Sequence, residues 1–118
     1  MITASDRYGS TVATNGYAAY EAAGELLRAL AAPIRVAIVM ELAAGERCVH
    51  ELVESIAAPQ PLVSQHLRVL RGAGLVRGSR RGREIAYSLV DEHVAHIVAD
   101  AVSHAREAKL SHAREARG

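Results

Sequence analysis

The stretch that decides the fold is PQPLVSQHLRVLRGAGLV, residues 59–76. Pro61 suits the first turn of a helix, where an amide hydrogen would have no partner, and apolar residues follow it at near-helical spacing. These apolar residues are Leu62, Val63, Leu67 and Leu70. Gly72 and Gly74 mark the end of the segment. The stretch therefore predicts an amphipathic helix that begins at Pro61 and ends at a turn.

A shorter helix is predicted ahead of this one, from about Val49 to Ala57, and the two are joined by a tight turn at Ala58 and Pro59. Two helices joined in this way form a helix-turn-helix, whose second helix enters the major groove of DNA. Glutamine can pair with adenine through two hydrogen bonds, and serine can donate or accept one. The side chains expected to read bases are therefore Gln60, Ser64 and Gln65. His66 and Arg68 are expected to contact the DNA backbone.

Two short extended runs follow, from Leu75 to Gly78 and from Glu84 to Leu89. Their branched and aromatic residues favour strands, so the segment predicts a β-hairpin with its tip at residues 79–83. The tip is basic, and its arginines are expected to contact phosphates, adding affinity with little sequence choice. These arginines are Arg80, Arg81 and Arg83. Since the whole chain has a formal net charge of only +1, this local concentration of arginine is what indicates double-stranded DNA as the partner.

Three more helices complete the predicted order. A first helix is expected from about Ala18 to Ala31, and a second from Pro33 to about Ala44, where Gly45 ends it. Asp91 is placed to cap a last helix that runs to at least Leu110. Four helices, a hairpin and a final helix (ααααββα) make a mainly α protein with a small β-hairpin, a winged helix-turn-helix.

Composition limits what else the chain can be. Its 118 residues are 50% apolar without Phe or Trp, enough for one domain packed on short aliphatic side chains. We expect a flexible N-terminal arm at residues 1–17, a DNA-binding and dimerisation domain at 18–110, and a C-terminal tail at 111–118. The single cysteine excludes an internal disulfide framework. With no signal segment and no apolar run of about 20 residues, we expect a soluble, cytoplasmic protein.

The last predicted helix carries four side chains of types that ligate divalent transition metals: Asp91, His93, His104 and Glu107, in the pattern D-x-H, ten residues, H-x-x-E. His93 and His104 share one helix face but lie about 16 Å apart along it, too far for one ion. Two copies packed antiparallel across a twofold axis bring the first pair of one helix to the second pair of the other. The spacing therefore predicts a homodimer with two closed sites between subunits. A closed site senses an ion, whereas hydrolysis needs an open position for water.

Cys48 and His50, at the start of the shorter helix, form a second, weaker constellation: a thiolate and an imidazole can bind a soft metal. Two alternatives to metal sensing in the last helix stay open. One is a redox- or sulfur-responsive repressor acting through Cys48, which would need a bond between subunits because there is no second thiol. The other is a small metal-dependent enzyme, which no arrangement of nucleophile and base supports, so an enzyme is not expected.

From Leu26 to Glu107 the chain resembles the ArsR/SmtB family of metalloregulatory repressors, and within it the actinobacterial, mycobacterial-type SmtB zinc sensors. The resemblance is carried by LLRALAAPIRVAIVMEL, ERCVHEL, PQPLVSQHLRVLRGAGLV, RRGREIAYSL and the paired D-x-H and H-x-x-E motifs. It implies a dimer that binds palindromic operator DNA when metal-free, and whose DNA affinity falls when zinc binds the two sites of the last helix. It also implies that His104, through its non-ligating nitrogen, is linked to a backbone carbonyl near Gly74.

The chain departs from the family pattern in two places. Where arsenic and cadmium sensors have Cys-Val-Cys, it has Cys48-Val49-His50, and this site is expected to be vestigial. Near the C-terminus, SHAREAK (103–109) is echoed by SHAREAR (111–117), and a step of eight residues rotates a helix by about 80°. His112 and Glu115 therefore do not share a helix face with His104 and Glu107. As extra ligands they would suit Ni2+ or Co2+, which prefer more ligands than Zn2+, so both ions remain alternatives to zinc.

Overall fold

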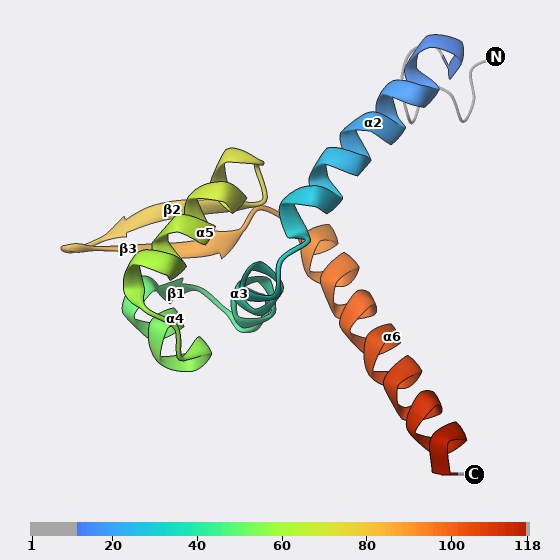
Figure 1. Ribbon diagram of the computed structural model, residues 1–118. Helices are drawn as coiled ribbons and strands as arrows, with labels where there is room; N and C mark the ends of the chain where they lie inside the picture. The colour runs from blue at the N-terminus through green and yellow to red at the C-terminus, as the bar shows by residue number, and fades with distance from the viewer. Residues whose placement is uncertain (1–11, 118) are drawn as a thin grey trace.

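The computed structural model describes residues 12–117, and Figure 1 shows a body of helices and a small sheet with one long helix at each end of the chain. Along the chain the elements are α2 (Val12–Leu30), α3 (Pro33–Ala44), β1 (Arg47–Cys48), α4 (Val49–Ile56), α5 (Gln60–Gly72), β2 (Val76–Arg81), β3 (Glu84–Leu89) and α6 (Glu92–Arg117). The predicted winged helix-turn-helix is confirmed, with one strand more than expected.

The helix boundaries follow the residues that predicted them. Pro33 occupies the first turn of α3, and Gly45 ends that helix with a φ of 155°. The backbone N–H of Val94 donates to Asp91 Oδ1 over 3.2 Å, so Asp91 caps α6 as expected. At the end of α4, Ala57 has a φ of 61°, the left-handed conformation that stops a helix.

The core lies where α3, α4, α5, the sheet and the start of α6 meet. Its buried side chains come from every one of these helices: Ile38, Val39, Leu52, Val63, Leu67, Leu70, Val94 and Val98. The hairpin formed by β2 and β3 is the wing of the fold. Leu75 and Val76, at its start, belong to the same buried cluster. Helix α5, the second helix of the helix-turn-helix and so the expected recognition helix, packs its apolar face against this core, which leaves its polar face outside.

The sheet has three antiparallel strands in the order β1-β3-β2, which corrects the expected two-stranded hairpin. Strand β1 pairs with β3 through Cys48 opposite Ala86. It is only two residues long, too short to leave an alternating pattern in the sequence.

The wing tip is also tighter than predicted. Strand β2 continues to Arg81, which pairs with Glu84, so the turn consists of Gly82 and Arg83 alone. Gly82 has a φ of 65°, a conformation that glycine adopts at no steric cost and that allows such a short turn. Arg80 and Arg81 are therefore strand residues that point to opposite faces of the sheet.

Helix α2 begins at Val12, not near Ala18, so the part of the predicted arm within the described residues is helical; residues 1–11 lie outside them. The start was missed because the sequence there shows no apolar periodicity, and residues 17–20, the next along this helix, are exposed. Tyr17 and Tyr20 stack edge to face on its surface, with 6.4 Å between the ring centres, and remain exposed.

The two end helices project from the body, giving extents of 54 × 51 × 20 Å and a radius of gyration of 17.6 Å. A compact chain of this length would have about 13–14 Å.

No helix in the described part of the chain is both long enough and apolar enough to cross a membrane.

Candidate nucleic-acid interface and metal ligands

Helix α5 turns one polar face away from the body. Its first residue, Gln60, and its fifth and sixth residues, Ser64 and Gln65, carry the side chains predicted to read bases. Gln60 and Gln65 are exposed, and Ser64 is half-buried beside the wing. Arg68 is exposed one turn beyond Ser64. Four of the five predicted contacts on α5 thus lie where DNA can reach them.

His66 is the exception on α5, because its ring is held against α3. Its Nδ1 atom lies 3.1 Å from Nη1 of Arg35, and Nε of the same arginine donates to the carbonyl oxygen of Ala29 over 2.6 Å. A guanidinium can only donate, so Nδ1 accepts this bond. Arg35 therefore ties the recognition helix to the end of α2. This role of Arg35 was not predicted, since nothing local to the residue indicates a partner 31 positions away.

The wing arginines differ in what they already bind. Nη2 of Arg81 lies 2.6 Å from Oε1 of Glu46, in the loop between α3 and β1. Arg80 points to the opposite face, the one that bears Tyr87 and meets α5, and Arg83 lies in the turn. Neither Arg80 nor Arg83 has an acidic partner among residues 12–117. The predicted phosphate contacts are thus sterically open at Arg80 and Arg83 and already engaged at Arg81.

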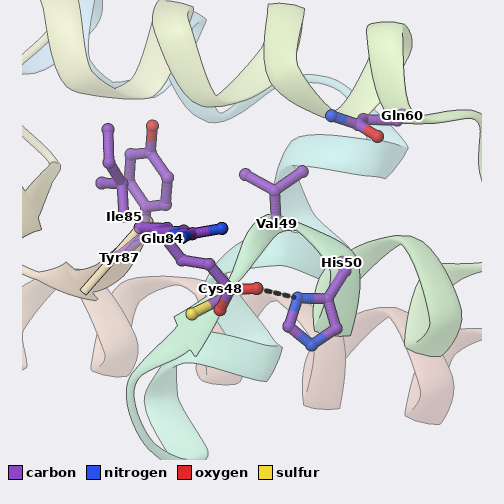
Figure 2. Close-up of a pocket in the computed structure, with 8 residues that line it drawn as sticks. Cys48, Val49, His50, Gln60, Glu84, Ile85 and Tyr87 are labelled. Atoms are coloured by element: carbon purple, nitrogen blue, oxygen red, sulfur yellow. Dashed lines mark ion pairs between the residues drawn. The ribbon is translucent and has the colours of Figure 1, made fainter. Parts of the chain in front are cut away.

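Cys48 and His50 line a hollow between α4 and the wing, and both meet the carboxylate of Glu84 there (Figure 2). His50 Nδ1 lies 3.2 Å from Glu84 Oε2. A hydrogen bond between the thiol and Glu84, then partial burial, then the charges of nearby glutamates raise the pKa of Cys48 from 9.0 to about 11. The backbone N–H of Cys48 also donates to Glu51 Oε1 over 2.8 Å. This acidic setting keeps the thiol protonated at neutral pH, which disfavours both a soft-metal site and redox chemistry there.

The four side chains predicted to bind metal all lie at the surface, on α6 and its cap. Asp91 Oδ1 and His93 Nδ1 are 3.8 Å apart, and these side chains are 53% and 88% exposed. His104 and Glu107 are exposed on the helix beyond the body. Within residues 12–117 of a single chain, no three His, Cys, Asp or Glu side chains converge to hold an ion. One protomer thus carries two separate pairs of donors, as the helical spacing requires.

Apolar surface is concentrated on the same two projecting helices. Leu27 on α2 is 53% exposed, and Leu110 on α6 is 59% exposed. Between the helices lies an apolar groove whose lining includes Leu27, Ala31, Ile97 and Ala101. Alanines in this lining let another helix approach closely.

Comparison with known proteins gives consistent matches. The model of the family described as "Bacterial regulatory protein, arsR family" matches residues 32–77. The HTH-type transcriptional repressor SmtB of Mycobacterium tuberculosis H37Rv is 65% identical over 82 residues, which cover 70% of this chain and 61% of that protein. The chain thus spans about three fifths of the length of that curated relative.

Solved structures agree with this match. The transcriptional repressor BigR from Xylella fastidiosa superposes with a TM-score of 0.66 at 36% identity, covering 76% of this chain and 91% of that one. The homodimeric winged helix-turn-helix DNA-binding domain of Mb0332 from Mycobacterium bovis, a possible ArsR-family transcriptional regulator, gives a TM-score of 0.69 at 29% identity. That alignment covers 82% of this chain and 89% of the domain.

Proposed function

The chain belongs to the ArsR family of bacterial regulatory proteins, and we propose that it is a transcriptional repressor that binds palindromic operator DNA as a metal-free homodimer and is released when zinc binds between its subunits. The observation that carries this proposal is the division of four metal-ligating side chains into two exposed pairs on one helix. Neither pair can saturate an ion alone, and a second copy supplies what each lacks.

The DNA half of the proposal rests on the exposed polar face of α5 and the open arginines of the wing. Gln60, Ser64 and Gln65 would contact base edges, and Arg68, Arg80 and Arg83 would contact phosphates. His66 and Arg81 remain candidates, although each already has a partner within the chain. A dimer of such domains would place two α5 helices in successive major grooves, which is why the proposed operator is palindromic.

The dimer half rests on the apolar surface of α2 and α6. These helices expose large apolar side chains that a monomer leaves in water, and the similar domain of Mb0332 is homodimeric. Antiparallel packing of two α6 helices would bring Asp91 and His93 of one subunit to His104 and Glu107 of the other. Two imidazoles and two carboxylates then fill a tetrahedron, a donor set that suits Zn2+.

The test separates the metal ligands of α6 from Cys48. Duplexes that the zinc-free protein selects from a random pool would be titrated with protein, with and without zinc, and followed by fluorescence anisotropy. We expect zinc to weaken binding by between about 5-fold and 150-fold in the wild type. The His104→Ala variant should respond less than twofold, and Cys48→Ala should respond like the wild type. A response lost only in Cys48→Ala would overturn the proposal in favour of a sensor that acts through the thiol.

The identity of the ion is tested by the same assay with Ni2+ and Co2+ in place of Zn2+. Helix α6 continues to Arg117, so His112 and Glu115 are on an exposed helix that could add ligands for an ion of higher coordination number. If zinc is the signal, it should release DNA at the lowest free concentration, and His112→Ala should leave that concentration unchanged. A larger effect of nickel or cobalt, lost in His112→Ala, would favour the nickel or cobalt sensor.

A further inference from the structure

A polar hollow lies between α5 and the wing. Two of its lining residues, Ser64 and Arg68, already have proposed DNA contacts, but the hollow as a whole, with Arg71 and Tyr87, has no role in the function proposed above. Its lining is Ser64, Leu67, Arg68 and Arg71 of α5 and Tyr87 of β3, and its volume is about 250 Å³. Residues 64, 68 and 71 are spaced four and three apart, so they lie along one face of the helix. Leu67 is buried and belongs to the core beneath them.

Arg71 reaches from α5 onto the surface of the wing. A Cβ atom placed on Gly78 of β2 would lie 2.9 Å from Cγ2 of Ile85, 3.3 Å from Cε1 of Tyr87 and 3.6 Å from Nη1 of Arg71. Gly78 and Tyr87 are opposite each other in the sheet, and the ring of Tyr87 points from β3 toward α5 (Figure 2). The guanidinium and the phenol ring therefore both lie beside Gly78, where a larger side chain would crowd them.

The arginines of this hollow also differ from the others near it. Arg35, Arg77 and Arg81 each bind an acceptor inside the chain: the Ala29 carbonyl, the Val90 carbonyl and the Glu46 carboxylate, respectively. Arg68 and Arg71 have no such acceptor among residues 12–117, and no carboxylate lines the hollow. Two guanidinium groups, a serine hydroxyl and a phenol then surround one space, which is the chemistry of an anion site.

We propose that this hollow holds a phosphodiester of the DNA backbone, with Arg71 and Arg68 as its charged ligands and Tyr87 as a neutral donor. The proposal rests on the proposed DNA-binding function. When α5 lies in a major groove and the wing lies beside it, the sugar–phosphate strand that borders the groove passes between them. The hollow is at that position. A phosphate held there would connect recognition helix and wing through one strand, and would add affinity without sequence choice.

The experiment measures how binding depends on salt for the zinc-free protein, with one selected duplex and one unrelated duplex. Each phosphate contact on B-DNA contributes about 0.9 to the slope of log affinity against log salt concentration. We expect Arg71→Ala to lower that slope by about 1 and to weaken both duplexes alike, by roughly tenfold or more. Tyr87→Phe, which removes only the hydroxyl, should weaken both duplexes by a smaller factor.

The matched control is Arg77→Ala. Arg77 is an exposed arginine on the same strand as Gly78, but it points to the other face and donates to Val90. This variant should keep the wild-type slope. An unchanged slope in Arg71→Ala, or a loss confined to the selected duplex, would overturn the phosphate site. If thermal unfolding shows that Arg71→Ala folds poorly, the same salt titration is made with Arg71→Gln, which also removes the charge and should lower the slope by the same amount. If the wild type binds neither duplex, the proposed function fails, which is a different result.

Discussion

The body of the protein, from α3 to β3, and the two long helices that flank it bury their apolar side chains to very different degrees. In the body, Ile38, Leu52 and Leu70 have no exposed surface, and the helices pack on one another from several sides. Among the side chains of α2 and α6 whose burial is described, the buried ones are Leu30, Val94 and Val98, and all three lie at the ends nearest the body. Beyond those ends both helices project from the body (Figure 1). They carry large apolar side chains that are exposed, among them Leu27 and Leu110.

The difference shows which functions one chain can complete alone. The body contains the whole of the proposed DNA-reading unit, α5 and the β2–β3 hairpin, already supported by a core. The projecting helices hold donors and apolar surface that have no partner within the described chain. In the proposed repressor, DNA contact is therefore a property of one subunit, and metal sensing is a property of two.

The largest effect expected from this difference is on stability, in the body. Leu67→Ala truncates a side chain on the buried face of α5 that is only 1% exposed. Such a truncation in a core lowers the free energy of unfolding by about 2–5 kcal/mol. Urea unfolding followed by circular dichroism should show this loss. The matched truncation on the projecting surface, Leu110→Ala, should lower stability by much less. Equal losses in the two variants would mean that α6 is as tightly packed as the body.

Thiol reactivity tests the polar contacts of the body. Because the hydrogen bond to Glu84 raises the pKa of Cys48 to about 11, the thiolate at pH 7.5 should be about 100-fold scarcer than for a thiol of ordinary pKa. Iodoacetamide should alkylate Cys48 correspondingly slowly, with a rate that climbs up to about pH 11. The Glu84→Gln variant should react faster at neutral pH, and fast alkylation of the wild type would contradict the contact.

The sign of the effect on stability follows from the same shift. A thiol whose pKa is higher in the folded state than in the unfolded state favours folding below pH 9. That contribution is lost as the pH rises from 9 through about 11. Relative to Cys48→Ser, the wild type should therefore lose stability over this interval and not at neutral pH.

Association is the next effect in size, and it belongs to the projecting helices. Leu27→Asp places a charge in the apolar groove between α2 and α6, where a partner helix is proposed to pack. We expect the dimer dissociation constant to rise by at least about tenfold, because a buried unpaired charge is costly. Sedimentation equilibrium measures this constant. Ser55→Asp, an exposed site on α4, is the control and should leave it unchanged.

The sequence predicted the packed body of the protein more completely than its projecting helices. Residues that are buried leave a pattern, so Val63, Leu67 and Leu70 located α5, and Pro33 and Gly45 bounded α3. The first turns of α2 left none, and strand β1 was too short to leave one. The pattern therefore reported burial, and it failed where the chain folds without burying side chains.

The candidate sites were predictable to a similar extent. The exposed face of α5 follows from its amphipathic pattern, so Gln60 and Gln65 could be placed on it from the sequence alone. The pairing of Arg35 with His66 could not, since it joins residues that only the tertiary fold brings together. The same is true of Arg81 with Glu46 and of Arg71 with the wing. The metal ligand set stays a prediction because its test requires two chains.

The smallest effect concerns the two neighbouring arginines of the wing. Arg81 is paired with Glu46 on one face of the sheet, whereas Arg80 faces the side that meets α5. An exposed ion pair contributes at most about 1 kcal/mol, so Arg81→Ala should hardly change stability. It should also weaken DNA binding less than Arg80→Ala, because Arg81 gives up an existing partner to reach a phosphate. Glu46→Gln frees Arg81 and should strengthen binding slightly to any duplex, as anisotropy at low salt would show. If Arg81→Ala instead costs as much affinity as Arg80→Ala, the pair with Glu46 breaks on the DNA, and both faces of the wing take part in binding.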